Sequence, residues 1–356
     1  MSRVHRYRTT VPSGPLEDSE SALPEPAGRE VLLRTLAAGV CHSDVHLHDT
    51  VFDLGNGRTL KAGGPGMTLG HEIAGEVVAT GPDVRYLAPG TRCAVYPWIG
   101  CGRCGLCESG DEHLCARGRV IGIQRDGGFG THVLVPDARY LFGIGDMDPA
   151  LACTLGCSGL TAFSALRKLG TMHARDRLLV VGAGGVGLNA VHMAATLFGV
   201  RPLVADIKAP QRDAALAAGA ESVFDPGAAD ALEAVLEATG GGAAAAIDFV
   251  GSEASSAFAQ RSLRKGGLLL VVGLFGGTFS MPLPMIPMLA RTIRGSYVGS
   301  RDEMAELVEL ARAGRIAPVP LVRRDASAAA ATTALADLRE GRVDGRAVLL
   351  FTETPP

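Results

Sequence analysis

The feature that most constrains the fold is a glycine-rich turn in the middle of the chain. Gly182, Gly184 and Gly187 give the spacing G-x-G-x-x-G directly after a strand-like apolar run and at the start of a helix-forming segment. That context, more than the spacing itself, predicts a dinucleotide-binding turn. The first glycine permits the tight turn, the second lets a pyrophosphate approach the backbone, and the third lets the helix pack close to the strand. The helix N-terminus, which includes Gly185 and Val186, then offers unpaired N–H groups to the phosphates.

A carboxylate at the end of the next strand-like run indicates which dinucleotide is bound. Asp206 follows Gly187 by nineteen residues. A carboxylate there accepts hydrogen bonds from the adenosine ribose hydroxyls and repels a 2′-phosphate, so we expect NAD rather than NADP. Lys208 is a nearby cation that softens this discrimination. The alternative is a structural turn with a solvated aspartate, which is less consistent with strand, glycines, helix and carboxylate occurring together.

The pattern of secondary structure changes near residue 150. Before it, short β-rich runs are bounded by glycine and proline, which predicts a mainly β domain. After it, strand-like runs alternate with helical segments, which predicts a doubly wound parallel sheet of the Rossmann type in an α/β protein. We interpret the alanine-rich stretches 228–246 and 326–336 as surface helices. The expected divisions are 1–152 for the β domain, with a cysteine-containing lobe at about 93–118, 153–297 for the dinucleotide-binding domain, and 298–356 for a return to the first domain.

Composition argues against several other classes of protein. The 47 glycines among 356 residues follow no G-X-Y period, and a net charge of −3 without blocks of like charge argues against nucleic-acid binding. No apolar stretch follows the N-terminal arginines, so a signal peptide is not expected. The longest apolar run, 266–277, is too short and too glycine-rich to span a membrane. Eight cysteines without a secretory signal suggest reduced thiols in the cytoplasm.

Four cysteines are grouped in one glycine-rich stretch. Cys101, Cys104, Cys107 and Cys115 give the spacing C-x2-C-x2-C-x7-C. Four thiolates so close in sequence can enclose a tetrahedral Zn²⁺ with no open position, which makes a structural site. An iron–sulfur run has a shorter last gap and a proline after its fourth cysteine, whereas Ala116 stands here. Disulfides are disfavoured in a cytoplasmic chain, so we expect structural zinc.

Three further candidate ligands are widely separated. Cys41, His71 and Cys157 stand in separate short motifs, and their spacing gives no argument for a shared site. Taken singly, each is more often a packed core thiol or a hydrogen-bonded histidine.

Taken in order, the motifs are similar to those of a known family. The chain resembles the zinc-dependent alcohol dehydrogenases of the medium-chain dehydrogenase/reductase family, and the likeness extends over nearly its whole length. The motifs that carry it are Cys41-His42-Ser43-Asp44, Gly70-His71-Glu72, the four-cysteine group, Cys157-x-Gly159-x-Thr161, the glycine-rich turn, and Gly345-Arg346-Ala347-Val348. An ordered set of this kind is far more specific than any one of its members.

The resemblance implies a second zinc and a GroES-like fold for the β domain. The catalytic zinc would be bound by Cys41, His71 and Cys157, with a fourth position open for water or substrate. Cys153 competes for the third place, but only Cys157 stands in the matching register. Related polyol dehydrogenases have a glutamate at this position, so Cys157 favours an alcohol dehydrogenase. The implied cofactors are two Zn²⁺ per chain and NAD.

The resemblance also implies residue roles. Ser43 would take the hydroxyl proton of the alcohol and His46 would pass it to solvent, while Asp44 would orient His71 and Glu72 would lie behind the zinc. Two groups would contact the dinucleotide, first the pyrophosphate and then the lining of its cleft: His42 and Arg346; Phe249, Val250, Gly251, Val272, Gly273 and Leu274.

The expected activity is hydride transfer between an alcohol and NAD, giving an aldehyde or ketone. The alternatives are a zinc-independent quinone or alkene reductase on the same fold, a polyol dehydrogenase, and a binding protein without catalytic activity. Stretch 49–67 lies between two expected ligands, so we expect it to border the substrate entrance. Phe52, Leu54 and Trp98 are candidate pocket walls. The segment 281–288, rich in Met and Pro, is a candidate contact between subunits of a homodimer or homotetramer.

Overall fold

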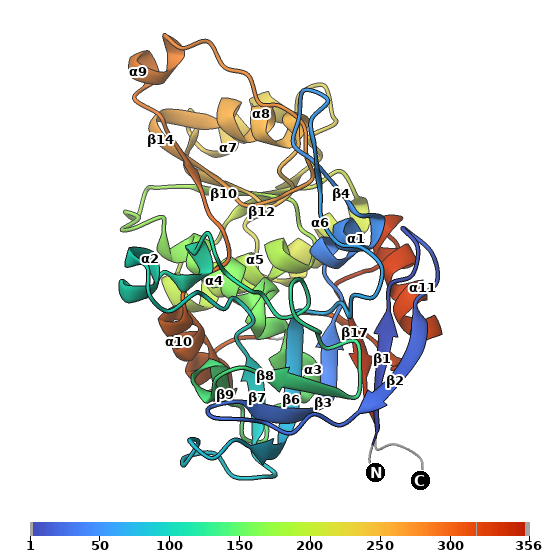
Figure 1. The fold of residues 1–356 in the computed structure, drawn as a ribbon. Helices are drawn as coiled ribbons and strands as arrows, with labels where there is room; N and C mark the ends of the chain where they lie inside the picture. Colours follow the sequence, from blue (N-terminus) through green and yellow to red (C-terminus); the bar gives the residue numbers. More distant parts are fainter. Residues whose placement is uncertain (1–2, 318, 353–356) are drawn as a thin grey trace.

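The computed structural model describes residues 3–317 and 319–352, and these form two lobes, one above the other in Figure 1. Each lobe is built on one large sheet. The remaining positions, 1–2, 318 and 353–356, belong to the expected segments 1–152 and 298–356 and lie outside the described residues.

The six-stranded lobe is the expected doubly wound parallel sheet. Its strand order is β12-β11-β10-β13-β14-β15, and every neighbouring pair is parallel. From β10 the chain adds β11 and β12 on one side, and from β13 it adds β14 and β15 on the other. The topological switch point therefore lies between β10 and β13. In such sheets ligands bind at the carboxyl ends of the strands at the switch point. The glycine-rich turn follows β10 at that place.

The bounds of this lobe's elements agree with buried apolar strands alternating with helices. The strands are β10 Leu178–Val181, β11 Leu203–Ala205, β12 Ser222–Phe224, β13 Ala243–Asp248, β14 Leu263–Val271 and β15 Thr292–Gly295. The helices are α5 Gly185–Phe198, α6 Ala209–Ala217, α7 Ala231–Ala238, α8 Glu253–Arg261 and α9 Met285–Leu289.

The prediction that stretch 228–246 is a surface helix is wrong in its second half. Helix α7 is present, but residues 243–246 begin β13, which lies between β10 and β14 in the middle of the sheet. Alanine favours helix intrinsically, yet small side chains also suit a strand that is covered on both faces, and this packing overrides propensity. The prediction for 326–336 is confirmed by α11 (Ala328–Arg339).

The seven-stranded lobe joins both ends of the chain. Its order is β16-β17-β3-β6-β7-β9, with β8 paired to β3, and β17 lies antiparallel to β3. Its strands are β3 Val31–Gly39, β6 Glu72–Thr80, β7 Arg92–Val95, β8 His132–Val135, β9 Leu141–Gly143, β16 Leu321–Asp325 and β17 Arg346–Leu350. The helices and 3-10 turns packed on or near it are α1 His42–Asp49, α2 Gly105–Glu108, η1 Glu112–Leu114, η2 Ala138–Tyr140, α3 Pro149–Ala152, η3 Cys153–Gly156 and α10 Arg301–Arg312. Helix α4 Ser158–Arg167 lies between the lobes and packs on α5.

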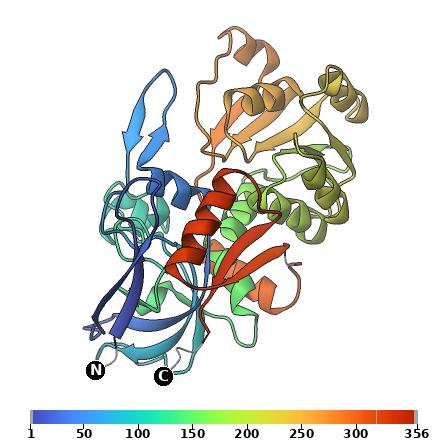
Figure 2. The same cartoon turned by 90° about the vertical axis from the view of Figure 1, so that its right-hand side faces the viewer.

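Two small hairpins complete the fold. The first pairs β1 (Arg3–Arg8) with β2 (Glu17–Ala22), and the second pairs β4 (Val51–Asp53) with β5 (Thr59–Lys61). The second extends from the seven-stranded lobe toward the other lobe (Figures 1 and 2). At its tip, a Cβ atom added to Gly55 would lie 2.4 Å from the carbonyl oxygen of Gly277. The hairpin therefore touches the six-stranded lobe directly.

No single helix among the described residues has the length and apolar composition needed to cross a membrane. The α3–η3 segment and α4 reach that length only together, with a bend of 52° between them. Most of their residues are buried inside the protein.

We expect Gly187 and Gly184 to respond differently to substitution by alanine. A Cβ at Gly187 would lie 1.9 Å from the carbonyl oxygen of Gly182, whereas one at Gly184 would meet no atom within 4 Å. Gly187→Ala should lower the free energy of unfolding by about 1–3 kcal/mol through overpacking. Gly184→Ala, the matched control, should change it by less than about 1 kcal/mol. Calorimetry of both variants measures this, and equal losses of thermal stability would contradict the packing role of Gly187.

Candidate metal and dinucleotide site

The three separated ligand candidates meet in the structure. Cys41 is the N-cap residue of α1, His71 immediately precedes β6, and Cys157 is the N-cap residue of α4. Their ligand atoms lie within 4.8 Å of one another, and all three residues are buried. The competing Cys153 is also buried, but its thiol donates to the carbonyl oxygen of Ala150.

The geometry of this group fits zinc. Two thiolates on a tetrahedral zinc stand about 3.8 Å apart, given Zn–S bonds of about 2.3 Å. The Sγ atoms of Cys41 and Cys157 are 4.0 Å apart. Both ring nitrogens of His71 are buried without a hydrogen-bond partner among the described residues. A buried polar atom needs a partner, and thiolate and imidazole donors together suit zinc.

Asp44 holds the backbone around the ligands. Its carboxylate accepts hydrogen bonds from the N–H groups of Cys41 at 2.8 Å and Gly70 at 3.1 Å. One of its oxygens also lies 3.3 Å from Nδ1 of His71, a close ionic contact that lacks the alignment of a hydrogen bond. Asp44 therefore ties together the two segments that carry Cys41 and His71.

The surroundings of Cys41 favour its thiolate. The hydrogen bond with Cys157 lowers the pKa of the Cys41 thiol well below its usual value, against the opposing effect of burial. The positive charge of Arg346 and the contact with His71 lower it further. A thiolate is the form that binds metal.

Glu72 and Arg346 form a buried ion pair behind these ligands. Nε of Arg346 donates to Glu72 at 2.8 Å and Nη2 at 2.5 Å, and Glu72 also accepts from the N–H of Ser158 at 2.9 Å. A Cβ at Gly39 would lie 2.0 Å from the Glu72 carboxylate, so glycine leaves the room for it. The remaining nitrogen, Nη1, lies 3.6 Å from the position a Cβ of Gly185 would take, at the glycine-rich turn. Sequence reasoning did not anticipate the ion pair.

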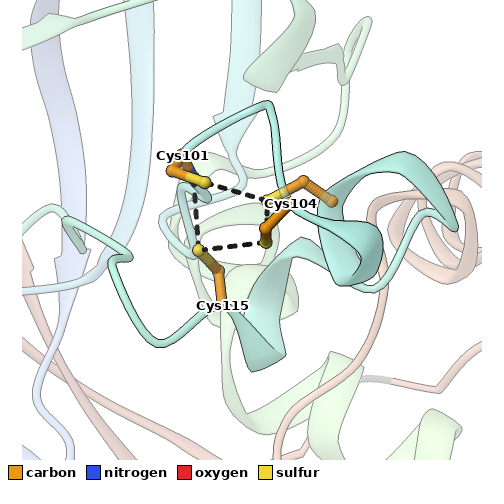
Figure 3. A group of neighbouring side chains, drawn as sticks. Cys101, Cys104 and Cys115 are labelled. Atoms are coloured by element: carbon orange, nitrogen blue, oxygen red, sulfur yellow. Dashed lines mark hydrogen bonds between the residues drawn. The ribbon is translucent and has the colours of Figure 1, made fainter.

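The four-cysteine group forms a second cluster (Figure 3). In it the sulfur atoms of Cys101, Cys104 and Cys115 point toward one another. The Cys104–Cys107, Cys104–Cys115 and Cys101–Cys107 Sγ distances are 3.5, 3.8 and 4.0 Å. These values match the edges of a tetrahedral Zn–thiolate site. The residues present fit a structural zinc.

Helix α1, whose N-cap residue is Cys41, also contains the two expected relay residues, Ser43 and His46. The hydroxyl of Ser43 lies 3.9 Å from Sγ of Cys41. His46, three residues later on the same helix face, packs on Phe52 of the β4–β5 hairpin, with ring centroids 4.7 Å apart and planes tilted by 35°. Burial lowers the pKa of His46 below 6.5, so its imidazole is neutral near pH 7. His42, at the start of the helix, is exposed.

The three glycines of the turn have distinct surroundings. Gly182 has φ of +90°, a conformation that favours glycine. Gly184, the N-cap of α5, leaves open space where a Cβ would stand, and Gly187 packs against Gly182. Asp206 accepts hydrogen bonds from the N–H groups of Ala183 and Lys208, each at 2.8 Å. The carboxylate is therefore fixed beside the turn.

Asp248, at the end of β13, is a residue that sequence reasoning missed. Its buried carboxylate accepts from the N–H groups of Val250 and Gly251 at 2.9 and 3.0 Å and from the hydroxyls of Ser255 and Ser256. It thus shapes residues 249–251, next to the switch point. In the sequence, a carboxylate at the end of an otherwise apolar strand could have indicated this role.

A cavity of about 410 Å³ lies against the four-cysteine group, since its lining includes Glu112 and Cys115. Trp98 forms part of its wall, donates its indole N–H to the carbonyl oxygen of Gly156 at 2.9 Å, and packs on His71 with ring centroids 5.5 Å apart. Of the other expected pocket walls, Phe52 contacts His46 and Leu54 is half-exposed at the hairpin tip.

Comparisons with known proteins agree with this geometry. Residues 27–146 match the family description "Alcohol dehydrogenase GroES-like domain", and residues 185–313 match "Zinc-binding dehydrogenase". The chain is 35% identical to an NAD-dependent alcohol dehydrogenase of Saccharolobus solfataricus, over 94% of this chain and 96% of the relative. It is 30% identical to a D-arabinose 1-dehydrogenase (NADP⁺) of the same organism, over 95% of each.

A solved structure shares the whole architecture. The alcohol dehydrogenase of Aeropyrum pernix superposes with a TM-score of 0.86 at 29% identity, covering 97% of this chain and 99% of that one. The similarity therefore covers both lobes and nearly the full length of the chain, including the two regions that match the family descriptions. The chain therefore belongs to the zinc-binding alcohol dehydrogenases with a GroES-like domain.

Proposed function

We propose that this protein oxidises alcohols to aldehydes or ketones with NAD, reversibly. The observation that carries the proposal is the convergence of Cys41, His71 and Cys157 into a set of three donors beside the dinucleotide turn. Three donors leave a tetrahedral metal one open position for substrate. Arg346, which reaches from Glu72 to Gly185, joins the metal side of the site to the cofactor side.

Cys41, His71 and Cys157 would hold the catalytic zinc, and the four-cysteine group a structural one. When bound, zinc lowers the pKa of the alcohol and NAD accepts the hydride. Ser43, beside Cys41, accepts the hydroxyl proton of the alcohol. His46, whose pKa is lowered by burial and whose ring is partly exposed, would take up that proton and release it to solvent.

The residues also bear on the alternatives. A zinc-independent quinone or alkene reductase has no use for three converging donors or for a four-thiolate cluster. A polyol dehydrogenase would be favoured by a carboxylate at position 157, where the structure places a buried thiol. Alcohol oxidation accounts for both metal-binding groups and the relay helix.

Asp206 supports a preference for NAD over NADP. Its carboxylate is held by two backbone N–H groups, so it cannot turn away from a 2′-phosphate. The nearby cation of Lys208 donates to the carbonyl oxygen of Gly341 at 2.7 Å, and Arg212 lies 3.3 Å from Asp225. Lys208 is thus engaged elsewhere, whereas Nη1 of Arg212 also donates to the backbone carbonyl oxygen of Asp206 at 2.8 Å and stays beside that residue. One relative in this family is named for NADP.

Removing one ligand from each metal group should separate catalysis from stability. Cys157→Ser should cost about one zinc per chain and reduce kcat/KM by at least about 10³-fold, since several kcal/mol of polarisation is lost. Cys104→Ser, the matched control, should also cost about one zinc and lower Tm by several degrees while folded protein keeps its kcat within about threefold. Metal analysis, calorimetry and assays with NAD and NADP in parallel test this.

The proposed activity would be refuted if the zinc-loaded protein produced no NADH from a broad panel of primary and secondary alcohols. Full activity of Cys157→Ser would instead revive the zinc-independent reductase.

His46 should determine the acid side of the pH profile. Because its pKa lies below 6.5, alcohol oxidation should be insensitive to this group at pH 7 and decline as pH falls through that pKa and the imidazole becomes protonated. His46→Gln should lower kcat by on the order of 10²-fold, with partial rescue by added imidazole. His48→Gln is the control, because His48 bonds to the carbonyl oxygen of Gly14 instead. An unchanged acid limb in His46→Gln would remove His46 from the relay.

We also infer self-association through the free edge of the six-stranded sheet. Strand β15 is the edge strand and is exposed along its length, and α9 beside it carries the exposed side chains of Met285 and Met288. An exposed parallel edge flanked by apolar side chains is a template for pairing with a second copy. Light scattering should find a dimer or tetramer that Ile293→Asp weakens, whereas a monomeric wild-type protein would overturn the inference.

A further inference from the structure

Asp248 lies in the middle of the sheet edge at which the dinucleotide is expected to bind. In the parallel sheet it is paired with Val181, the last residue of β10, and with Val271, the last residue of β14. Its side chain is fully buried. Three neighbouring strands therefore end level with Asp248, so this one residue is placed to contact the turns that follow them.

The side chain of Asp248 holds the turn that follows its own strand. Oδ1 accepts hydrogen bonds from the N–H groups of Val250 at 2.9 Å and Gly251 at 3.0 Å. Oδ2 accepts from the hydroxyls of Ser255 at 2.9 Å and Ser256 at 2.7 Å, both in the first turn of α8. A buried carboxylate needs partners for both of its oxygens. Because these four donors supply them, the turn and the start of α8 are fixed relative to each other.

The main-chain oxygen of Asp248 holds the turn that follows the neighbouring strand β14. This carbonyl oxygen accepts from the N–H groups of Val272 at 2.9 Å and Gly273 at 3.0 Å. The two turns also pack backbone against backbone, since a Cβ atom at Gly251 would overlap the carbonyl group of Gly273. The φ of Gly251 is +69°, a conformation that favours glycine. Asp248 therefore fixes both turns.

The order of the strands indicates which part of NAD lies over these two turns. Asp206, expected at the adenosine ribose, follows β11, and the glycine-rich turn, expected at the pyrophosphate, follows β10. The next strands across the sheet are β13 and then β14. A dinucleotide that extends along the carboxyl ends of the strands therefore has its nicotinamide half over the turns that Asp248 fixes. Val250 adjoins the pyrophosphate turn, because a Cβ atom at Gly182 would lie 2.6 Å from its side chain.

We propose that Asp248 is a positioning residue for the nicotinamide half of NAD, and that the adenosine half binds independently of it. Asp248 acts through the two turns, which it holds in one conformation before the cofactor arrives. A turn that is already ordered loses less conformational entropy on binding, so the affinity is higher. The inference rests on NAD as the cofactor of the proposed alcohol oxidation.

The test compares the binding of NADH, followed by its fluorescence, with that of AMP, followed by calorimetry, in the zinc-loaded protein. AMP represents the adenosine half alone. Asp248→Ala leaves four donors without their acceptor, so it should raise the Kd of NADH by about tenfold or more and leave the Kd of AMP within about twofold. A tenfold change corresponds to about 1.4 kcal/mol, the order of one hydrogen bond to a charged group.

Asp248→Asn is the conservative variant. Its amide oxygen can accept from the two backbone N–H groups, and its amide N–H groups can donate to the two serine hydroxyls. The Kd of NADH should therefore stay within about threefold of the wild-type value. This rescue by a neutral side chain of the same shape would show that the hydrogen bonds, rather than the negative charge, order the turns.

Two buried serines of the α8 region provide a matched pair of variants. Ser256 donates to Asp248, whereas Ser262, at the other end of α8, donates to the carbonyl oxygen of Phe258 at 2.9 Å. Ser256→Ala should raise the Kd of NADH by about two- to fivefold, and Ser262→Ala should leave it unchanged. The serine pair and Asp248→Asn also test the inference if Asp248→Ala yields no folded protein.

The outcomes separate this inference from the proposed function. Equal losses of NADH and AMP affinity in Asp248→Ala or Ser256→Ala would show a general role in folding and overturn the inference. Unchanged NADH affinity in both variants would overturn it as well, and in either case the proposed oxidation would stand. A wild-type protein that binds NADH but oxidises no alcohol would overturn the proposed function alone.

Discussion

The buried ion pair of Glu72 with Arg346 is the contact on which the rest of the site depends. Two buried charges carry a large desolvation cost, which is offset only when the geometry is good and their polar atoms are satisfied. Both oxygens of Glu72 accept from Arg346, and one accepts from Ser158 as well. The pair therefore joins the starts of β6, β17 and α4, so the segments bearing His71 and Cys157 are placed by an interaction that tolerates little displacement.

Helix N-termini add a second electrostatic constraint at the same place. Cys41, Cys157 and Gly184 are the N-cap residues of α1, α4 and α5. The positive end of a helix dipole favours thiolate over thiol and attracts phosphate. Three helices from different parts of the chain therefore present their positive ends where two thiolates and a pyrophosphate are expected. The negative charge of Glu72 opposes this field in part, because it adds to the hydrogen bond with Cys41, burial and the charge of Cys41 in raising the pKa of the Cys157 thiol.

Features whose residues lie close together in the chain could be predicted from the sequence, whereas contacts between distant residues could not. The glycine-rich turn and the four-cysteine group are local, so their spacing alone nearly determines their geometry. Cys41, His71 and Cys157 are far apart, and only the ordered resemblance to a family grouped them. Glu72 and Arg346 are 274 positions apart in the chain, and no sequence motif predicts their contact. The strained backbone of Val298 was equally hidden, because a valine in a left-handed conformation is imposed by tertiary anchors that composition does not reveal.

The contacts between the two lobes show why the Glu72–Arg346 pair is important for the site. Besides the chain crossings, the described contacts between the lobes include the hairpin tip at Gly55, the Lys208–Gly341 hydrogen bond and the Gln211–Asp344 hydrogen bond. They are accompanied by a large apolar contact, because α4 packs on α5 and one buried cluster includes residues of both lobes, among them Val95, Phe163 and Val191. The metal ligands belong to one lobe and the dinucleotide turn to the other. The Glu72–Arg346 pair links the two, because it is anchored at both ends within the seven-stranded sheet and Nη1 of Arg346 reaches toward the turn.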